Sequence, residues 1–129
     1  MPTILLIDDE TSIIEVMGDS LVKAGYEVLP AENGEKGLQL LEKEAVDAVV
    51  TDIIMPEKEG LETIIEIRRK QPELPIIAIS GGGRTRQLHF LEISRDFGAN
   101  DVLQKPFKPS QLIASLHSLL ATQRDLPSA

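Results

Sequence analysis

The sequence contains no cysteine and no tryptophan, and only 3% of its residues are aromatic. Without cysteine, the chain forms no disulfide bonds and no thiolate metal sites. Basic residues are also few: 13 lysines and arginines stand against 21 aspartates and glutamates, which gives a formal net charge of −8. Polyanions repel a chain of this charge, so we expect neither nucleic acid nor a membrane surface as a partner.

Long apolar runs are missing as well. No stretch approaches the roughly 20 apolar residues that a membrane-spanning helix needs. An apolar strand pattern begins within three residues of the N-terminus with no basic segment before it, so we expect no signal peptide. We therefore expect a cytoplasmic protein. With 42% hydrophobic residues in a length of 129, the chain has enough apolar material for one domain with its own core.

Short apolar runs alternate with amphipathic stretches along the whole chain. Val, Ile and Leu crowd the first, third and fourth runs without alternation, which is typical of strands covered on both faces. The predicted strands are 3–8, 26–31, 46–52, 75–80 and 101–104. The predicted helices are 11–24, 34–44, 58–70, 85–97 and 109–122. In the third helix, the side chains expected to face the sheet are Leu61, Ile64 and Ile65.

The segments follow the order strand, helix, strand, helix throughout. Parallel strands joined by right-handed helical crossovers carry helices on both faces of their sheet. The sequence therefore predicts a single doubly wound α/β domain. We expect this domain over residues 1–122 and a short tail over residues 123–129.

Polar side chains stand at the predicted carboxyl ends of four strands. They are Asp8, Asp9, Asp52, Ser80 and Lys105. In doubly wound sheets, ligands bind in the crevice outside the carboxyl ends of the strands. We therefore expect these side chains to lie together in one site.

Repulsion between carboxylates dominates the electrostatics of such a site. The three aspartates contribute −3 and Lys105 contributes +1, so about −2 remains for one Mg²⁺ to neutralise. Zinc is less favoured because no thiol and no histidine lies near these strand ends. A carboxylate such as Asp52 can also attack a phosphoryl group, with Lys105 and the hydroxyl of Ser80 available to bind the phosphoryl oxygens.

Each of these residues alone has a simpler explanation. The pair Asp8 and Asp9 is also typical of a helix N-terminus, and Asp52 is also typical of a cap at a strand end. Gly81–Gly83 resemble a phosphate-binding loop but lack its Gly-Lys-Ser/Thr ending, so we expect a mobile loop over the site. The two histidines fall within helix patterns, where we expect surface or packing roles.

Together these residues resemble the receiver domain of two-component response regulators, of the chemotaxis-regulator type. The resemblance covers roughly residues 3–122. It is carried, in chain order, by Asp8-Asp9, Asp52-x-x-Met55-Pro56-x-x-x-Gly60, Ser80, Gly98-Ala99 and Lys105-Pro106-Phe107. The resemblance implies a flavodoxin-like fold of five helices around a five-stranded parallel sheet in the order 2-1-3-4-5. It also implies a receiver domain that stands alone on this chain.

The resemblance further implies a phosphorylation-dependent signalling switch. Asp52 would accept a phosphoryl group from a sensor histidine kinase or a histidine phosphotransfer protein, and Ser80 and Lys105 would contact that group. The metal ligands for Mg²⁺ would be Asp8 (largely through water), Asp9, Asp52 and the backbone carbonyl of Ile54. The Lys105–Pro106 bond is typically cis in the family. The only reactions catalysed would be the chain's own phosphorylation and dephosphorylation.

The signal would leave the domain by partner binding or by phosphorelay. The expected partner surface in the family is the face made by the fourth helix, the fifth strand and the fifth helix. Family members usually carry an aromatic residue where this chain has Val102, and that ring rotates on activation. Ser80 also replaces the more common threonine. We therefore expect the switch to use the glycine-rich loop over 81–87 and the fourth helix instead.

Two other functions remain open at the level of the sequence. A haloacid-dehalogenase-type phosphatase would also use Asp52 as its nucleophile, but that class needs an acid two residues later, where this chain has Ile54. The second is a receiver-like interaction module that works without phosphorylation. Turnover of a small phosphomonoester would favour the phosphatase. Magnesium-dependent labelling by acetyl phosphate, lost in Asp52→Asn, separates the interaction module from the signalling switch.

Overall fold

The computed structural model describes the backbone of residues 1–53, 59–80, 95–105 and 107–125. Side chains are described for all of these except 59, 60, 80 and 122–125. The described strands and helices are β1 (Thr3–Ile7), α1 (Thr11–Lys23), β2 (Glu27–Ala31), α2 (Gly34–Lys43), β3 (Ala48–Asp52), α3 (Glu59–Lys70), β4 (Ile76–Ser80), β5 (Asp101–Gln104) and α5 (Pro109–Asp125). Residues 95–97 are also helical, and the rest of the helix predicted over 85–97 lies outside the described residues.

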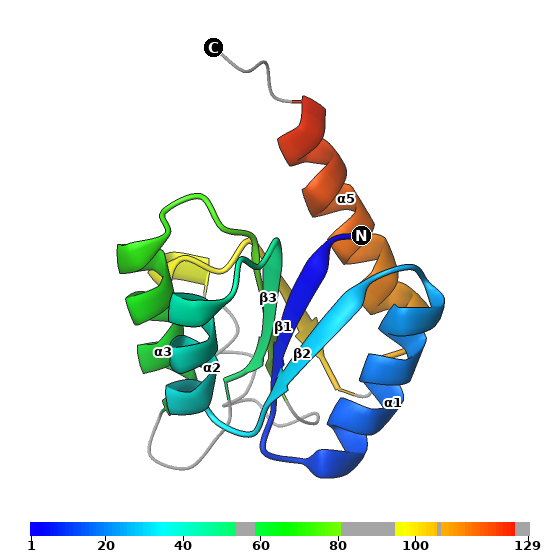
Figure 1. The fold of residues 1–129 in the computed structure, drawn as a ribbon, viewed down its shortest axis with the longest axis horizontal. Helices are drawn as coiled ribbons and strands as arrows, with labels where there is room; N and C mark the ends of the chain where they lie inside the picture. Colours follow the sequence, from blue (N-terminus) through cyan, green and yellow to red (C-terminus); the bar gives the residue numbers. More distant parts are fainter. Residues whose placement is uncertain (54–58, 81–94, 106, 126–129) are drawn as a thin grey trace.

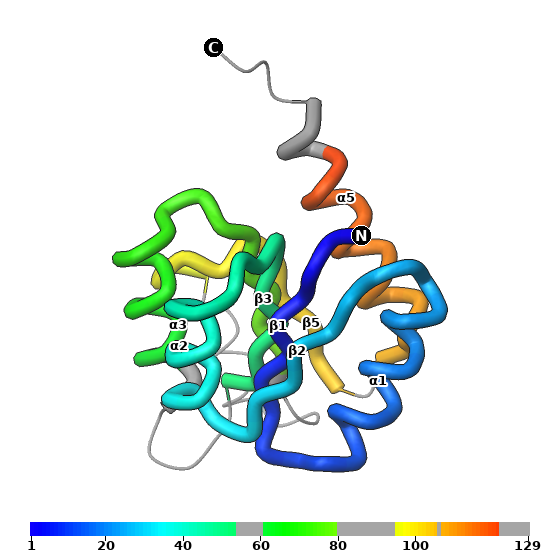
Figure 2. Tube along the Cα trace, viewed as in Figure 1, coloured from blue at the N-terminus to red at the C-terminus, as the bar shows by residue number. Residues whose placement is uncertain are grey.

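The five strands form one parallel sheet in the order β2-β1-β3-β4-β5. α1 and α5 cover one face of this sheet, and α2 and α3 cover the other (Figures 1 and 2). The predicted doubly wound α/β fold and its strand order are therefore confirmed. β1 and β3 are neighbours within the sheet, so their carboxyl ends lie side by side.

Side chains of each strand alternate between two hydrophobic cores. Ile4 and Leu6 of β1 pack with residues of α1 and α5, whereas Leu5 and Ile7 pack with residues of α2 and α3. All four side chains are fully buried. Because helices cover both faces, the side chains of a central strand such as β1 are buried on both sides, which explains its continuous apolar run in the sequence.

The helix ends follow local signals. Gly25 comes shortly after α1 with φ at 99°, and Gly98 precedes β5 with φ at 127°, a conformation that residues with a Cβ atom rarely adopt. α5 begins at Pro109, whose fixed φ suits a first helical turn, and extends to Asp125, beyond the predicted end at 122. None of the helices in the described ranges has the length and apolar character that crossing a membrane requires.

One predicted core residue is wrong. Ile65 of α3 is 36% exposed, whereas Ile64 and Ile67 are buried. At about 100° per residue, Ile65 lies roughly 100° from Ile64 and roughly 160° from Ile67 around the helix axis. The buried face of α3 includes Ile64 and Ile67, and Ile65 lies outside this face.

Candidate functional site

Two carboxylates are buried at the carboxyl ends of the neighbouring strands β1 and β3. Asp8 follows β1 directly, and its backbone N–H donates to the carbonyl of Ala31 at 3.1 Å, which extends the pairing with β2 by one residue. Asp52 is the last residue of β3. Their exposed fractions are 1% and 2%. Burial of this degree is costly for a carboxylate without compensation, so both groups need a charged or hydrogen-bonding partner.

Lys105 is that partner for both carboxylates. Its Nζ lies 3.2 Å from Oδ2 of Asp8 and 3.2 Å from Oδ2 of Asp52. The lysine follows β5, at the opposite side of the sheet from β2, and reaches back across the strand ends. Its side chain is only 15% exposed. A single ammonium group therefore bridges the two buried aspartates.

A third carboxylate reaches the same lysine. Oε1 of Glu10 lies 3.4 Å from Nζ of Lys105. The turn after β1 brings it there, because Oδ1 of Asp8 accepts a hydrogen bond from the backbone N–H of Glu10 at 2.9 Å. The sequence interpretation missed Glu10. The run Asp-Asp-Glu after the first strand was the signal that pointed to it.

The pKa shifts show that the buried charges are only partly compensated. Burial raises the pKa of Asp8, and the opposing effects of the hydrogen bond from Glu10 and the charge of Lys105 do not cancel this rise. Burial would lower the pKa of Lys105, but the charges of Asp52 and Asp8 outweigh it and raise that pKa. The lysine is therefore held in its charged form, while the carboxylates around it keep excess negative charge.

This excess charge suits a divalent cation. Carboxylate oxygens of four residues lie within 4.8 Å of one another: Asp8, Asp9, Glu10 and Asp52. The group contains oxygen donors alone, which is the set that Mg²⁺ and Ca²⁺ prefer, and it contains no nitrogen or sulfur donor of the kind that zinc selects. The four acids with Lys105 leave a formal charge near −3, so the residues present fit a bound Mg²⁺.

The structure brings together four of the residues predicted for the site: Asp8, Asp9, Asp52 and Lys105. The backbone of Ser80 ends β4 beside Gln104 of β5, which places it at the same edge of the sheet. The side chain of Ser80, the carbonyl of Ile54, the Lys105–Pro106 bond, the glycine-rich loop over 81–87 and His89 lie outside the described residues.

Two further predictions concern residues that the structure describes. Val102 of β5 is half-buried and packs against the core beneath α2 and α3. His117 lies on α5 and is exposed, so the prediction of a surface or packing role for this histidine is confirmed. Neither residue belongs to the acidic cluster.

The chain resembles known proteins over almost its whole length. Residues 4–117 match the response regulator receiver domain family. The sequence is 39% identical over 118 residues to the probable transcriptional regulator ycf27 of Porphyra purpurea, covering 91% of this chain and 46% of that protein. It is 30% identical over 118 residues to the alkaline phosphatase synthesis transcriptional regulatory protein PhoP of Bacillus subtilis, covering 91% of this chain and 48% of that protein.

Solved structures agree with this relationship. A CheY-like receiver domain protein from Methanospirillum hungatei superposes with a TM-score of 0.86 at 28% identity, covering 96% of this chain and 97% of that one. The receiver domain of NtrX from Brucella abortus superposes with a TM-score of 0.85 at 31% identity, covering 92% and 98%. The chain spans about half the length of the curated relatives ycf27 and PhoP that it matches.

The fold and the site define a doubly wound α/β domain with an acidic, lysine-bridged centre at the carboxyl ends of its strands. The chain belongs to the response regulator receiver domain family, the phosphorylation-dependent signalling domains of two-component systems. Domains of this family are generally non-enzymatic signalling modules, and they interact with histidine kinases or phosphotransfer proteins.

Proposed function

We propose that Asp52 is the phosphoryl acceptor of a signalling switch, and that its donor is a phosphohistidine on a sensor kinase or a phosphotransfer protein. One observation carries this proposal: the carboxylate of Asp52 is buried at a strand end, 3.2 Å from Nζ of Lys105 and next to three further acids. A structural cap at a strand end needs no such convergence of four acids.

The proposed transfer is a displacement at phosphorus. A carboxylate oxygen of Asp52 attacks the phosphorus atom, a P–O bond forms, the P–N bond to the donor imidazole breaks, and the released ring nitrogen takes up a proton. Lys105 then binds a phosphoryl oxygen as a compact positive charge, which requires it to exchange its contact with Asp52 for one with the new group. Ser80 ends β4 at the same edge and would donate its hydroxyl to another phosphoryl oxygen.

The acidic cluster supports a role for Mg²⁺ in this reaction. Asp9 and Asp52 would bind the ion directly, with the backbone carbonyl of Ile54, and Asp8 would act largely through water. When bound, the ion supplies neutralisation of the phosphoryl oxygens. We add Glu10 to the groups that tune this site, because its carboxylate lies within the same cluster and competes for Lys105.

The proposal extends to the signalling role of the whole domain. The chain would catalyse only its own phosphorylation and dephosphorylation, within a receiver domain over residues 1–122 that acts in the cytoplasm, where response regulators generally work. The signal would pass by binding a protein partner or by phosphorelay to another histidine. Val102 is half-buried against the core and has no ring to rotate, which supports a switch that uses other parts of the domain.

Covalent labelling tests the proposal. The wild-type chain and the variant Asp52→Asn are incubated with acetyl phosphate and MgCl₂, and the phosphorylated fraction is measured by intact mass spectrometry. We expect Mg²⁺-dependent labelling of the wild type and none of the variant. The matched control is Asp19→Asn, because Asp19 is an exposed aspartate of α1 outside the cluster, and it should label like the wild type. An unlabelled wild type, or equal labelling of Asp52→Asn, contradicts the proposal.

A further inference from the structure

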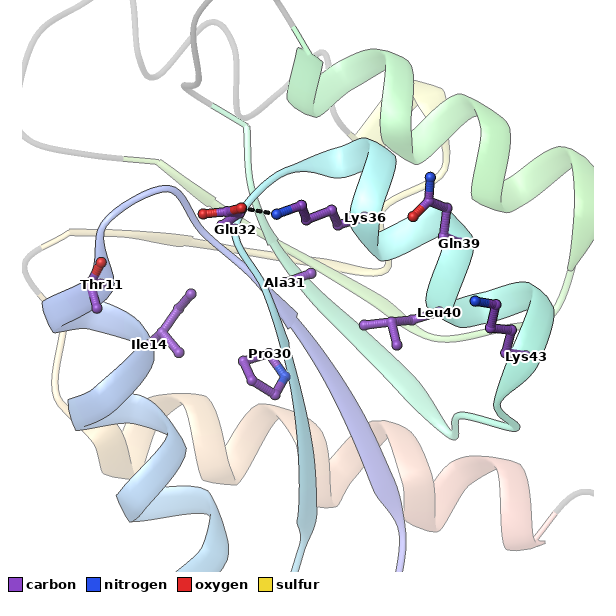
Figure 3. Close-up of a pocket in the computed structure, with 9 residues that line it drawn as sticks. All are labelled: Thr11, Ile14, Pro30, Ala31, Glu32, Lys36, Gln39, Leu40 and Lys43. Atoms are coloured by element: carbon purple, nitrogen blue, oxygen red, sulfur yellow. Dashed lines mark hydrogen bonds and ion pairs between the residues drawn. The ribbon is translucent and has the colours of Figure 1, made fainter.

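A second concave site lies at the outer edge of the sheet, between α1 and α2 (Figure 3). It is a cavity of about 480 Å³ that opens over the edge strand β2. Cavities of this size hold small molecules. It is distinct from the acidic cluster, since none of the four clustered acids lines it.

The floor of the cavity is apolar. Ile14 extends from α1, Pro30 lies on β2, and Leu40 extends from α2 toward the sheet (Figure 3). The side chains of Ile14 and Leu40 are only half-buried, and Pro30 is exposed. Part of the apolar surface of these three residues is therefore accessible to a bound molecule.

The edge strand does not favour the addition of a further strand here. The carbonyl of Ala31 bonds the N–H of Asp8, and the N–H of Glu27 bonds the carbonyl of Pro2, so the odd-numbered residues of β2 face β1. Val28 and Pro30 alternate with them and direct their backbones to the open edge. Because Pro30 has no N–H, it interrupts the ladder that an added strand would need. A small molecule fits the cavity better than an extended peptide.

The polar groups of the cavity favour an anion. Lys36, Gln39, Leu40 and Lys43 line it from α2 at spacings of three, four and seven residues, which places them on one face of the helix. Lys36 is ion-paired with Glu32. The amine of Lys43 and the side-chain amide of Gln39 have no hydrogen bond or ion pair within the described part of the chain. Among the described residues, the positive charge of Lys43 thus has no ion-pair partner, in a chain whose formal charge is −8.

We propose that this cavity binds a small anionic amphiphile. Its carboxylate or phosphate head contacts Lys43 and Gln39, and its apolar body lies along Leu40, Pro30 and Ile14. The site requires no phosphorylation of the acidic cluster, so its test is independent of the signalling role proposed above.

A titration followed by two-dimensional ¹H–¹⁵N NMR tests the proposal. The unphosphorylated full chain is titrated separately with hexanoate, hexyl phosphate, hexanol and hexylammonium. We expect saturable shifts at the backbone amides that line the cavity on α1, β2 and α2 with hexanoate or hexyl phosphate, and weaker shifts with hexanol. The stronger of the two anions identifies the head group. Absence of shifts there with both anions, or equal shifts with hexylammonium, overturns the proposal.

Two lysine variants separate a built site from general attraction of anions. Lys43→Gln should weaken binding of the preferred anion by about tenfold, because it removes a charge-assisted contact. Lys23→Gln is the matched control: Lys23 is also an exposed lysine in the last turn of its helix, on α1, and it does not line the cavity. The Lys23→Gln variant should bind the preferred anion as tightly as the wild type does. If the two variants bind it with equal affinity, the proposal is overturned. Both positions are exposed, so neither substitution threatens the fold.

Discussion

At the scale of single residues, the buried carboxylates of the acidic cluster lower the stability of the folded protein. Asp8 and Asp52 are almost completely buried, yet they share one lysine with a third acid. The raised pKa of Asp8 means that the folded protein holds its ionised form less well than water does. A free-energy cost of this kind is typical of a carboxylate that binds a cation. It predicts how the stability of the folded protein depends on Asp8.

Replacing Asp8 by Asn should stabilise the metal-free protein at neutral pH. Because the folded-state pKa of Asp8 is raised, the unfolded chain ionises first as pH increases. Stability is therefore lost from the ordinary pKa of an aspartate, about 4, up to the folded-state pKa, and the loss stays constant above it. Asn keeps an oxygen for the N–H of Glu10 but cannot ionise. Urea unfolding in EDTA, measured from about pH 4 to pH 8, should show an advantage of Asp8→Asn that grows with pH and then levels off.

The control for this series is Asp19→Asn on the exposed surface of α1. Its difference from the wild type should stay small across the same range. A difference between Asp8→Asn and the wild type that is flat, or that shrinks as pH increases, would contradict the assignment of strain to Asp8.

The site residues differ in how far the sequence predicted them. Asp8 and Asp52 were predictable because each lies at the end of an apolar run, and Lys105 because it follows the predicted strand 101–104. Parallel strands bring such ends to one edge. Glu10 extends the acidic run that begins at Asp8, but the contact of its side chain with Lys105 depends on the turn after β1. Its backbone N–H donates to Asp8 in that turn, and its side chain reaches Lys105. Apolar periodicity carries no information on the geometry of the turn.

At the scale of elements, two helical glycines with different surroundings allow a matched test. A Cβ atom on Gly37 of α2 would lie 2.5 Å from Cδ1 and 2.9 Å from Cγ1 of Ile7, a side chain that is fully buried in β1. A Cβ on Gly18 of α1 would meet only Cγ1 of Val28, at 3.9 Å. Gly37 therefore sets how closely α2 approaches the sheet, whereas Gly18 leaves room.

Alanine should act in opposite directions at these two positions. Gly37→Ala should lower the free energy of unfolding by about 1–3 kcal/mol, because it overpacks the contact with β1. Gly18→Ala should raise it by about 0.5–1 kcal/mol through helix propensity. Chemical denaturation of both variants checks this. The same sign at both sites would show that helix propensity, and not the approach of α2 to Ile7, decides the effect.

Arg68 in the last turn of α3 forms hydrogen bonds with the segments that precede β4 and β5. Its guanidinium donates to the carbonyls of Pro72 at 2.7 Å and Gly98 at 2.6 Å, and to Oδ1 of Asn100 at 3.0 Å. Oδ1 of Asn100 also accepts the backbone N–H of Ile76 at the start of β4, at 2.8 Å. The arginine therefore donates hydrogen bonds to backbone carbonyls of the segments that precede β4 and β5.

Arg68→Met should lower the free energy of unfolding by about 1–3 kcal/mol, because the part-buried carbonyl of Gly98 loses its bond to Arg68 together with two more exposed acceptors. Arg69→Met is the matched control on the same turn. The side chain of Arg69 is 74% exposed and forms a surface ion pair with Glu66, so its loss should change stability by less than about 0.5 kcal/mol. Thermal unfolding of the two variants measures the difference. Equal effects would show that the contacts of Arg68 contribute no more than a surface ion pair.

The sequence predicted the ranges of the described helices and strands closely. It predicted less well which face of a helix is buried. Strand and helix ranges came from apolar period and from glycine and proline positions such as Gly25 and Pro109, which act locally. The rotation of α3 is decided by its neighbours instead. Ile64 and Ile65 look equivalent in the sequence, but the packing of α3 on the sheet buries the first and exposes the second. Leu61, Ile64 and Ile67 lie on the buried face, whereas the sequence alone allowed Ile65 in place of Ile67.

At the scale of the whole molecule, the acidic cluster links cation binding to folding. Its acids come from the loop after β1 and from the end of β3, and Lys105 comes from the end of β5, so only the folded chain holds them within reach of one another. A ligand that binds the folded state alone stabilises it by mass action. The overall charge of −8 adds a second effect, because any salt screens the repulsion between the remaining carboxylates.

Mg²⁺ should therefore stabilise the protein beyond the effect of ionic strength. At a concentration about 100 times its dissociation constant, it should raise the free energy of unfolding by roughly 2.7 kcal/mol.

Unfolding is measured in MgCl₂ and in NaCl of equal ionic strength, for the wild type and for Asp52→Asn. The NaCl increment should be the same in both proteins, because it depends on overall charge. The additional Mg²⁺ increment should be large in the wild type and much reduced in the variant, because Asp52 is one of the two buried acids of the cluster. Equal increments from the two salts in the wild type would mean that the four acids form no cation site and that screening alone relieves their repulsion.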